Sequence, residues 1–126
     1  MVKRAKLSTL KKRAWKAFSE YIRKKYAING YVYCCTCGER KHWKEMHAGH
    51  YIHNRLNIYF DERNVHPQCN KCNTFLHGNG RMYERFMRDT YGEEVIEELE
   101  TLKNVTIKLS RKDYLEIESE YKNKPV

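Results

Sequence analysis

Four cysteines arranged as two C-x-x-C pairs are the residues of this chain best suited to bind a metal ion. Cys34 and Cys37 form the first pair, Cys69 and Cys72 form the second, and 31 residues separate the pairs. Each short turn directs two sulfurs toward one point, and two such turns supply the four thiolates that tetrahedral zinc accepts. The pattern predicts a structural zinc site; redox or disulfide chemistry is the alternative. Cys35 falls outside the pairing, and we expect it to be a free thiol.

Histidine and asparagine residues suited to phosphodiester hydrolysis lie between the two cysteine pairs and just after the second. His50 belongs to the segment 47–51, Asn64 precedes the second pair, and Asn73 directly follows it. A neutral histidine can accept a proton from attacking water while a divalent cation stabilises the phosphate and the leaving oxygen. We therefore expect His50 to act as general base, Asn64 to orient it, and Asn73 to bind catalytic Mg²⁺ or Mn²⁺.

The remaining histidines include one further candidate ligand for the catalytic cation. His47 lies three positions before His50, and imidazole suits transition metals, although residues three apart on a strand point to opposite faces. His66 and His77 are candidates for metal or phosphate contacts. His42 and His53 are expected at the surface.

Positive charge is concentrated at the start of the chain. Lys and Arg number 25 against 16 Asp and Glu, which gives a formal charge of +9, and the segment 1–25 holds ten basic residues and one acid, Glu20. Clustered cations favour a polyanion through counterion release, and a solvated basic surface is the alternative. The candidate DNA contacts are Lys11, Lys12, Arg13, Lys16, Arg23, Lys24, Arg55, Arg63, Lys71 and Arg81.

Apolar residues at helical spacing predict a helix near the N-terminus. Leu10, Trp15, Phe18 and Ile22 recur on one face, opposite a basic face, and Ser8 is suited to cap the first turn. Amphipathic helices pack their apolar stripe into the core, so we assign packing to the aromatic residues and binding to the charges.

Short strands and then a helix are expected in the cysteine region. Strand-type patterns cover 31–33, 46–52 and 64–66, with a loop at 54–61, and a helix is expected to begin at Asn73. The order strand, strand, helix matches the plan of a ββα-metal, or HNH-like, core.

Helical patterns dominate the C-terminal part. Apolar spacing predicts helices near 82–89 and 95–102, and Ser110 with Asp113 forms a capping-box variant before a final helix. We expect these helices to serve packing or a dimer surface.

The predicted fold class is α+β, with a zinc-stabilised ββα-metal core flanked by an N-terminal basic helix and C-terminal helices. We expect a single domain over 1–126, divided into the basic helix at 1–30, the zinc core at 31–80 and a helical part at 81–126. No apolar run is long enough to cross a bilayer and no signal-peptide pattern occurs, which predicts a cytoplasmic protein without a membrane partner.

Several motifs together resemble the phage NinG family, also called Rap. They are the segments 18–23 (FSEYIR), 48–51 (AGHY) and 68–73 (QCNKCN), and Gly78-Asn79 followed by Tyr83. The resemblance implies a recombination nuclease of phage or prophage origin, active in a bacterial host cell on branched DNA such as Holliday junctions or displacement loops. A junction resolvase makes two symmetric cuts, which favours a homodimer.

The layout is also similar to that of phage endonuclease VII. In that enzyme an asparagine directly follows the last zinc cysteine and helps to bind the catalytic metal, and Asn73 occupies this place. The acidic ligand that precedes the catalytic histidine would fall on Gly49, so another residue must complete the site, and His47 is our candidate.

The sequence thus predicts a metal-dependent, structure-selective DNA endonuclease. A non-catalytic zinc-ribbon protein that binds DNA during recombination would explain the cysteines and the charge, but not the ordered His50, Asn64 and Asn73. A less selective HNH endonuclease that cuts ordinary duplex or single-stranded DNA is the second alternative.

Overall fold

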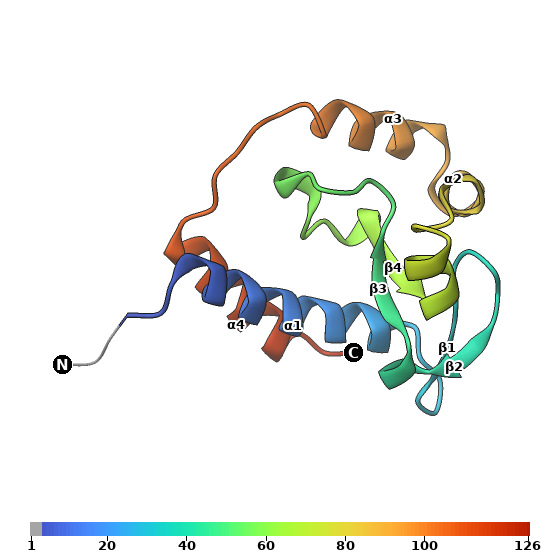
Figure 1. The fold of residues 1–126 in the computed structure, drawn as a ribbon, viewed down its shortest axis with the longest axis horizontal. Helices are drawn as coiled ribbons and strands as arrows, with labels where there is room; N and C mark the ends of the chain where they lie inside the picture. Colours follow the sequence, from blue (N-terminus) through green and yellow to red (C-terminus); the bar gives the residue numbers. More distant parts are fainter. Residues whose placement is uncertain (1–3) are drawn as a thin grey trace.

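The computed structural model describes residues 4–126 as a mixture of helices and two small sheets, which makes this an α+β protein. Helices α1 (Leu7–Lys25) and α4 (Arg111–Asn123) pack side by side along the lower part of Figure 1. Helices α2 (Gly80–Tyr91) and α3 (Glu93–Leu102) lie on the other side of the sheets. Two of the strands, residues 47–50 and 65–68, therefore lie between the two groups of helices.

Helix α1 has the predicted apolar face but a different start. Leu10, Phe18 and Ile22 are buried, as their spacing predicts. The expected cap at Ser8 is wrong, because the helix begins at Leu7, two residues before the start that a Ser8 cap implies, and its cap position, Lys6, makes no side-chain capping bond. Ser8 thus lies inside the first turn.

Helix α4 begins with the predicted capping box. The Ser110 side chain accepts a hydrogen bond from the Asp113 amide, and the Asp113 carboxylate accepts one from the Ser110 amide. Tyr114 is buried against α1, and Arg13 of α1 donates two hydrogen bonds, of 3.1 and 2.7 Å, to Glu118. The buried face of α4 therefore belongs to the core.

Two antiparallel hairpins carry the cysteine region. Strand β1 (Tyr31–Tyr33) pairs with β2 (Arg40–His42), and β3 (His47–His50) pairs with β4 (Val65–Gln68). The second hairpin is shorter at β3 and begins one residue later at β4 than the sequence predicts. The reason is that Asn64 ends a 3₁₀ turn, Glu62–Asn64, and uses its side chain to bind the loop instead.

The helix expected to start at Asn73 is reduced to one π-helical turn, Lys71–Phe75. Three successive residues then have positive φ, namely His77 at 50°, Gly78 at 94° and Asn79 at 48°. Residues in this left-handed region cannot continue a right-handed helix. Asn73 consequently lies in the middle of the turn, and the next helix, α2, starts only at Gly80.

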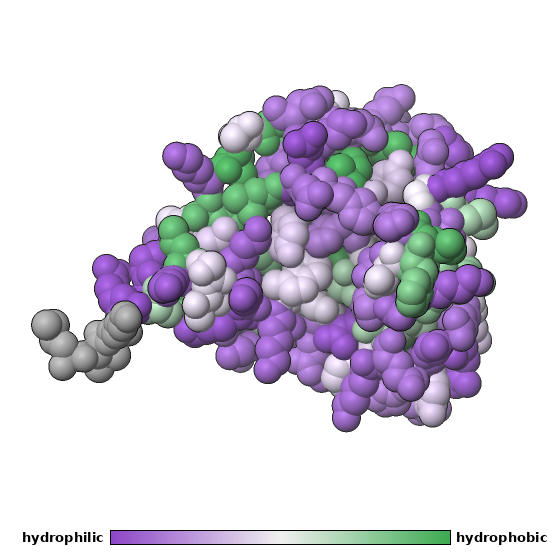
Figure 2. Space-filling view, viewed as in Figure 1, coloured by the Kyte–Doolittle hydropathy of each residue, from purple (hydrophilic) through white to green (hydrophobic). Residues whose placement is uncertain are grey.

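Side chains from both helical groups bury the β3–β4 hairpin. On the α1 side, Phe18 and Ile22 pack with Ala48 and Val65. On the other side, a second cluster centres on Tyr83, which is fully buried. Figure 2 shows a mainly hydrophilic face, with hydrophobic atoms along the connection between α3 and α4. Among residues 4–126, no helix is both long and apolar enough to span a membrane.

Candidate metal and catalytic site

The four paired cysteines come together as predicted. Their sulfur atoms all lie within 4.8 Å of one another, and the sulfurs of Cys37 and Cys69 are 3.6 Å apart. A tetrahedral zinc ion with bonds of about 2.3 Å places its sulfurs about 3.8 Å apart. The donor set and its spacing therefore fit zinc.

Hydrogen bonds around the cluster favour a thiolate at Cys34. Its sulfur lies 3.3 Å from the hydroxyl of Thr36, which itself accepts a bond from Gln68. Burial would raise the pKa of Cys34, but the bonds from Thr36 and from backbone amides lower it to about 6. Cys35 is a free thiol that packs against the cluster around Tyr83, and burial raises its pKa.

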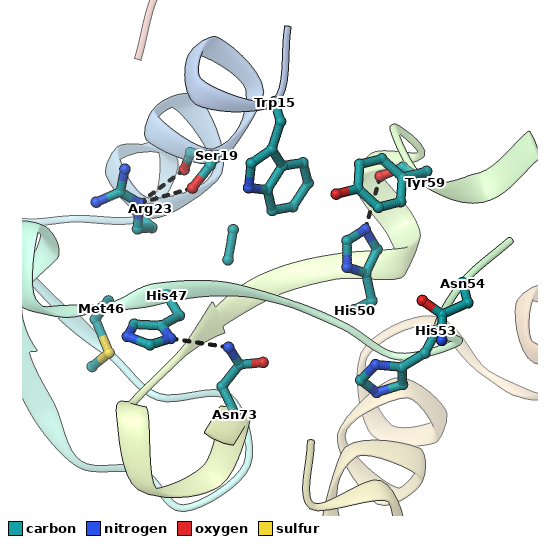
Figure 3. Close-up of a pocket in the computed structure, with 11 residues that line it drawn as sticks. Trp15, Ser19, Arg23, Met46, His47, His50, His53, Asn54, Tyr59 and Asn73 are labelled. Carbon is teal, nitrogen blue, oxygen red and sulfur yellow. Dashed lines mark hydrogen bonds between the residues drawn. The ribbon is translucent and has the colours of Figure 1, made fainter. Parts of the chain in front are cut away.

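An open pocket of about 450 Å³ lies between α1, β3 and the π-helical turn (Figure 3). His47 and His50 of β3 both line it, together with Asn73 and Trp15. Strand β3 pairs with β4 alone, so its other edge is open to this pocket. Three of the predicted site residues are thus brought together in one place.

His50 is held in one orientation by aromatic stacking and a backbone carbonyl. Its ring stacks on Trp15 with the centroids 5.0 Å apart, and its Nε2 lies 3.0 Å from the carbonyl oxygen of Tyr59 (Figure 3). A carbonyl only accepts, so Nε2 carries the proton and Nδ1 is the basic nitrogen. Burial lowers the pKa of His50 to about 4. The ring is therefore neutral at pH 7.

Within residues 4–126 the Asn64 side chain makes no hydrogen bond to His50, but it fixes the loop that holds His50. The fully buried side chain accepts a hydrogen bond from the Ile52 amide at 2.9 Å and donates to the carbonyls of Ile52 and Ile58. Ile58 immediately precedes Tyr59, whose carbonyl binds His50. Any influence of Asn64 on His50 would therefore pass through this loop, and its predicted orienting role remains a prediction.

His47 and Asn73 form a close pair at the other end of the pocket. The amide Nδ2 of Asn73 is 3.0 Å from Nδ1 of His47. Adjacent ligands of an octahedral cation with bonds of about 2.1 Å are separated by about 3 Å, so the spacing fits a shared ion once the amide oxygen faces it. Among residues 4–126, only the four cysteines form a cluster of three or more His, Cys, Asp or Glu donors. The remaining ligands would be water and phosphate.

Gly49 faces away from any such ion. A Cβ at this position would lie 1.9 Å from Oε1 of Gln68, and the Gly49 carbonyl accepts a 2.7 Å hydrogen bond from Tyr83. An acidic side chain at position 49 would have to displace the buried Gln68. A carboxylate at position 49, where the endonuclease VII layout places one, would therefore point toward Gln68 and not into the pocket.

His66 has a structural environment. It is buried outside the pocket, with Nδ1 3.0 Å from the Tyr83 hydroxyl and Nε2 2.7 Å from the Tyr91 hydroxyl. Tyr83 donates to Gly49, so its oxygen accepts from Nδ1 of His66, and Nε2 accepts from Tyr91. Both ring nitrogens are thus engaged in holding α2 against β4.

The other three histidines are more exposed. His53 is exposed, as predicted, but also lines the pocket, and His77 is exposed in the left-handed turn. His42 lies in β2, where its ring accepts a bond from the Lys44 amide.

The two residues that hold His50 in the pocket were not expected from the sequence. Trp15 belongs to the helical apolar stripe and was assigned to the core, yet its ring is only half buried and stacks on His50. Tyr59 contributes a backbone carbonyl, for which no residue type is a signal. The helical spacing of Trp15 predicts only that it lies on the inward face of the helix, and it does not indicate which residue its ring contacts.

Some predicted DNA contacts face the pocket. Arg23 lines it and donates to the Ser19 backbone and hydroxyl and to the Trp43 carbonyl, and burial lowers its pKa. Lys11 lies 4.7 Å from the centre of the Tyr59 ring, close to His50. Of these two cations, only Arg23 lines the pocket itself.

Of the other predicted contacts, some are already held in ion pairs with acidic residues and the rest are not. Arg13 is bound to Glu118, and Arg63 is bound to Asp61 and Glu98. Lys24 pairs with Glu20 and lies over Trp43. Among the described residues, the exposed cations of the set without an ion pair are Lys12, Lys16, Arg55, Lys71 and Arg81.

Fold and site together define a small α+β protein with a four-cysteine cluster that fits a metal ion, beside a pocket lined by histidine and asparagine. The family described as Bacteriophage Lambda NinG protein matches residues 2–125, and the chain belongs to this family.

Curated relatives agree with the family match. Protein ninG of Escherichia phage 933W and protein ninG of Escherichia phage lambda are each 30% identical over 105 residues, which cover 75% of this chain. The matched part is 52% and 51% of these relatives, so the chain spans about half their length. No solved structure matches. The relatives are bacteriophage proteins, as the motifs predict.

Proposed function

We propose that this chain is a metal-dependent DNA endonuclease that cuts branched recombination intermediates such as Holliday junctions and displacement loops. The observation that carries the proposal is a single pocket lined both by a neutral, oriented His50 and by the His47–Asn73 pair. This combination supplies a base and a cation site, which together suit hydrolysis of a phosphodiester.

His50 is the general base of the proposed reaction. The Tyr59 carbonyl holds the proton on Nε2, and stacking on Trp15 fixes the ring plane, so Nδ1 accepts the proton of the attacking water. Arg23 lines the same pocket and can bind the phosphate through N–H groups not used on Ser19 and Trp43.

Asn73 and His47 are the protein ligands of the proposed catalytic cation, Mg²⁺ or Mn²⁺. A bound cation supplies charge stabilisation to the phosphate and the leaving oxygen. Asn73 is connected to the cysteine cluster, because its backbone N–H donates a 2.9 Å hydrogen bond to the backbone carbonyl of Cys69. Structural zinc would therefore hold Asn73 at a constant distance from β3. The order β3, β4 and π-helical turn supports an HNH-like core with a one-turn helix.

We include branch selectivity and dimer formation in the proposal because the resemblance to the family implies them. Two symmetric cuts require two sites, which a homodimer supplies. Helix α4 uses its buried face on α1, so the exposed apolar residues Val105 and Ile107 of the connection between α3 and α4 are the better candidates for an interface. The work would take place in the cytoplasm of a bacterial host.

Replacement of His50 tests the enzyme against a non-catalytic DNA-binding accessory protein. His50→Ala should reduce divalent-metal-dependent nicking by about 10²–10⁴-fold, because the general base is lost. Zinc content and DNA affinity of the same variant should stay at the wild-type level. His77→Asn is the matched control, since His77 is exposed and asparagine tolerates its positive φ. Cleavage by His50→Ala at the wild-type rate would refute the mechanism.

A comparison of substrates separates the branch-selective enzyme from a general nuclease. Four-way junction, displacement loop, flap and linear duplex should be cut at one salt concentration, because salt alone changes DNA affinity strongly. Faster cutting of branched substrates supports the proposal. Equal cleavage rates on all four substrates would instead support a less selective HNH endonuclease.

A further inference from the structure

Two adjoining cavities beside the β1–β2 hairpin take no part in the proposed reaction. They have volumes of about 390 and 350 Å³, and both are lined by Tyr26 and Tyr33. The larger one shares no lining residue with the pocket of His50. Its volume falls in the range of small-ligand sites, which is roughly 300–1,000 Å³.

Exposed tyrosines surround these cavities. Tyr26, Tyr31 and Tyr33 keep 53%, 43% and 64% of their surface exposed, within eight residues of chain. Single exposed aromatic residues are common at protein surfaces and need no explanation. Three that converge on two adjoining cavities form a surface able to receive flat rings. We call these three residues the tyrosine platform.

Cations accompany the platform. The guanidinium of Arg40 lies 4.6 Å from the centre of the Tyr31 ring, and the ammonium of Lys25 lies 5.1 Å from that of Tyr26. Arg40 lines the smaller cavity and makes no ion pair within residues 4–126. Lys25 is paired with Glu62 at 3.0 Å, and Glu39, the acid of the β1–β2 hairpin, is paired with Lys41. The charge at this surface therefore suits an anionic partner.

The floor of the larger cavity combines flat apolar walls with polar groups. Pro67 and Phe86 provide the walls, and Thr90, Tyr91 and His66 supply polar atoms. The Tyr91 hydroxyl is within 2.7 Å of His66, so the polar atoms are already ordered. A nucleobase has the same combination of flat faces and polar edges.

We propose that the tyrosine platform binds unpaired bases of single-stranded DNA by stacking, while Arg40 neutralises an adjoining phosphate. Aromatic platforms bordered by cations bind single strands in this way without sequence preference. The inference rests on the proposed function in one respect: branched DNA exposes unpaired bases that linear duplex lacks, so the platform would supply branch selectivity.

Binding of oligothymidine of about 15 nucleotides tests the platform without cleavage. Tyr33→Ala and Tyr26→Ala in the full chain should each weaken binding about tenfold by fluorescence anisotropy, in line with the loss of one stacked base. Tyr33→Phe keeps the ring and should bind like the wild type. Affinity for linear duplex of equal length should not change in any of these variants.

Phe75→Ala is the matched control, because Phe75 is 70% exposed and lines neither cavity. It should leave oligothymidine binding unchanged. Equal losses in Phe75→Ala and Tyr33→Ala, or no loss in either tyrosine variant, would overturn the proposal. So would a change of oligomeric state in Tyr33→Ala at unchanged DNA affinity, since the platform would then be a self-association surface.

The outcomes separate this inference from the proposed function. If Tyr33→Ala and Tyr26→Ala bind oligothymidine like the wild type while cleavage still depends on His50, the platform proposal is refuted and the nuclease proposal stands. If binding depends on the platform but no metal-dependent cleavage occurs, the platform proposal stands and the nuclease proposal is refuted.

Discussion

Gly49→Ala is expected to destabilise the protein through a single steric contact. The added Cβ would lie 1.9 Å from Oε1 of Gln68, 2.7 Å from its Cδ and 3.0 Å from its Cγ. The first two separations are too short for any relaxed structure, and Gln68 is fully buried. Either the Gln68 side chain or the strand β3 must move.

The cost can be worked out from the bonds of Gln68. Its Nε2 donates to the Thr36 hydroxyl at 3.1 Å and to the Gly78 carbonyl at 2.8 Å. A buried group left without its partner costs about 1–3 kcal/mol, and overpacking costs about 1–3 kcal/mol. The reduced freedom of the unfolded chain returns about 0.4–1 kcal/mol. Taken together, these contributions predict a net loss of about 3 kcal/mol in the free energy of unfolding.

Urea unfolding followed by circular dichroism, with zinc present throughout, measures this loss. Gly80→Ala is the matched control, because no atom lies within 4 Å of the place that its methyl group would occupy and its φ is ordinary. It should be neutral or stabilise the protein slightly. A difference below about 0.5 kcal/mol between the two variants would refute the steric reasoning.

A double-mutant cycle identifies the contact. Gln68→Ala removes the obstructing amide, so Gly49→Ala should cost less in that background than in the wild type. Additive losses would mean that the contact between Gly49 and Gln68 is not the cause.

Three further predictions concern the metal, the phosphate and the pH. Removal of zinc by a chelator, or Cys72→Ser, should unfold at least the cysteine region, since structural zinc in finger peptides contributes about 10–16 kcal/mol; retention of the wild-type circular dichroism spectrum without bound zinc would contradict this. Arg23→Gln should reduce the slope of log affinity for duplex DNA against log salt by about 0.9, whereas Lys112→Gln, the same charge change at an exposed site of α4, should not. Burial lowers the pKa of His66 to about 4 from 6.5. The fold therefore favours neutral His66, and its contribution is complete above pH 6.5 and is lost toward pH 4. His66→Gln should flatten the pH dependence of unfolding in that window, and an unchanged slope would exclude the assignment.

Local patterns were sufficient where neighbours in sequence decide the structure. The two C-x-x-C turns predicted the sulfur cluster, because each turn preorganises its own pair of ligands. Ser110 and Asp113 predicted the start of α4, because a capping box involves only four consecutive residues. The helix after Asn73 was predicted too long, because the left-handed backbone at 77–79 interrupts it.

Tertiary packing decided the chemistry of the pocket. Trp15 stacks on His50 from another element, and the Tyr59 carbonyl selects the tautomer of His50 from a loop nine residues away. Whether a cation is free of an ion pair was also decided by distant residues, as Arg13 is bound by Glu118, 105 positions away. The sequence by itself determined which residue types were present and which turns and helices they formed. Which of them face one another depended on how those elements pack, because contacts between distant segments arise only after the chain has folded.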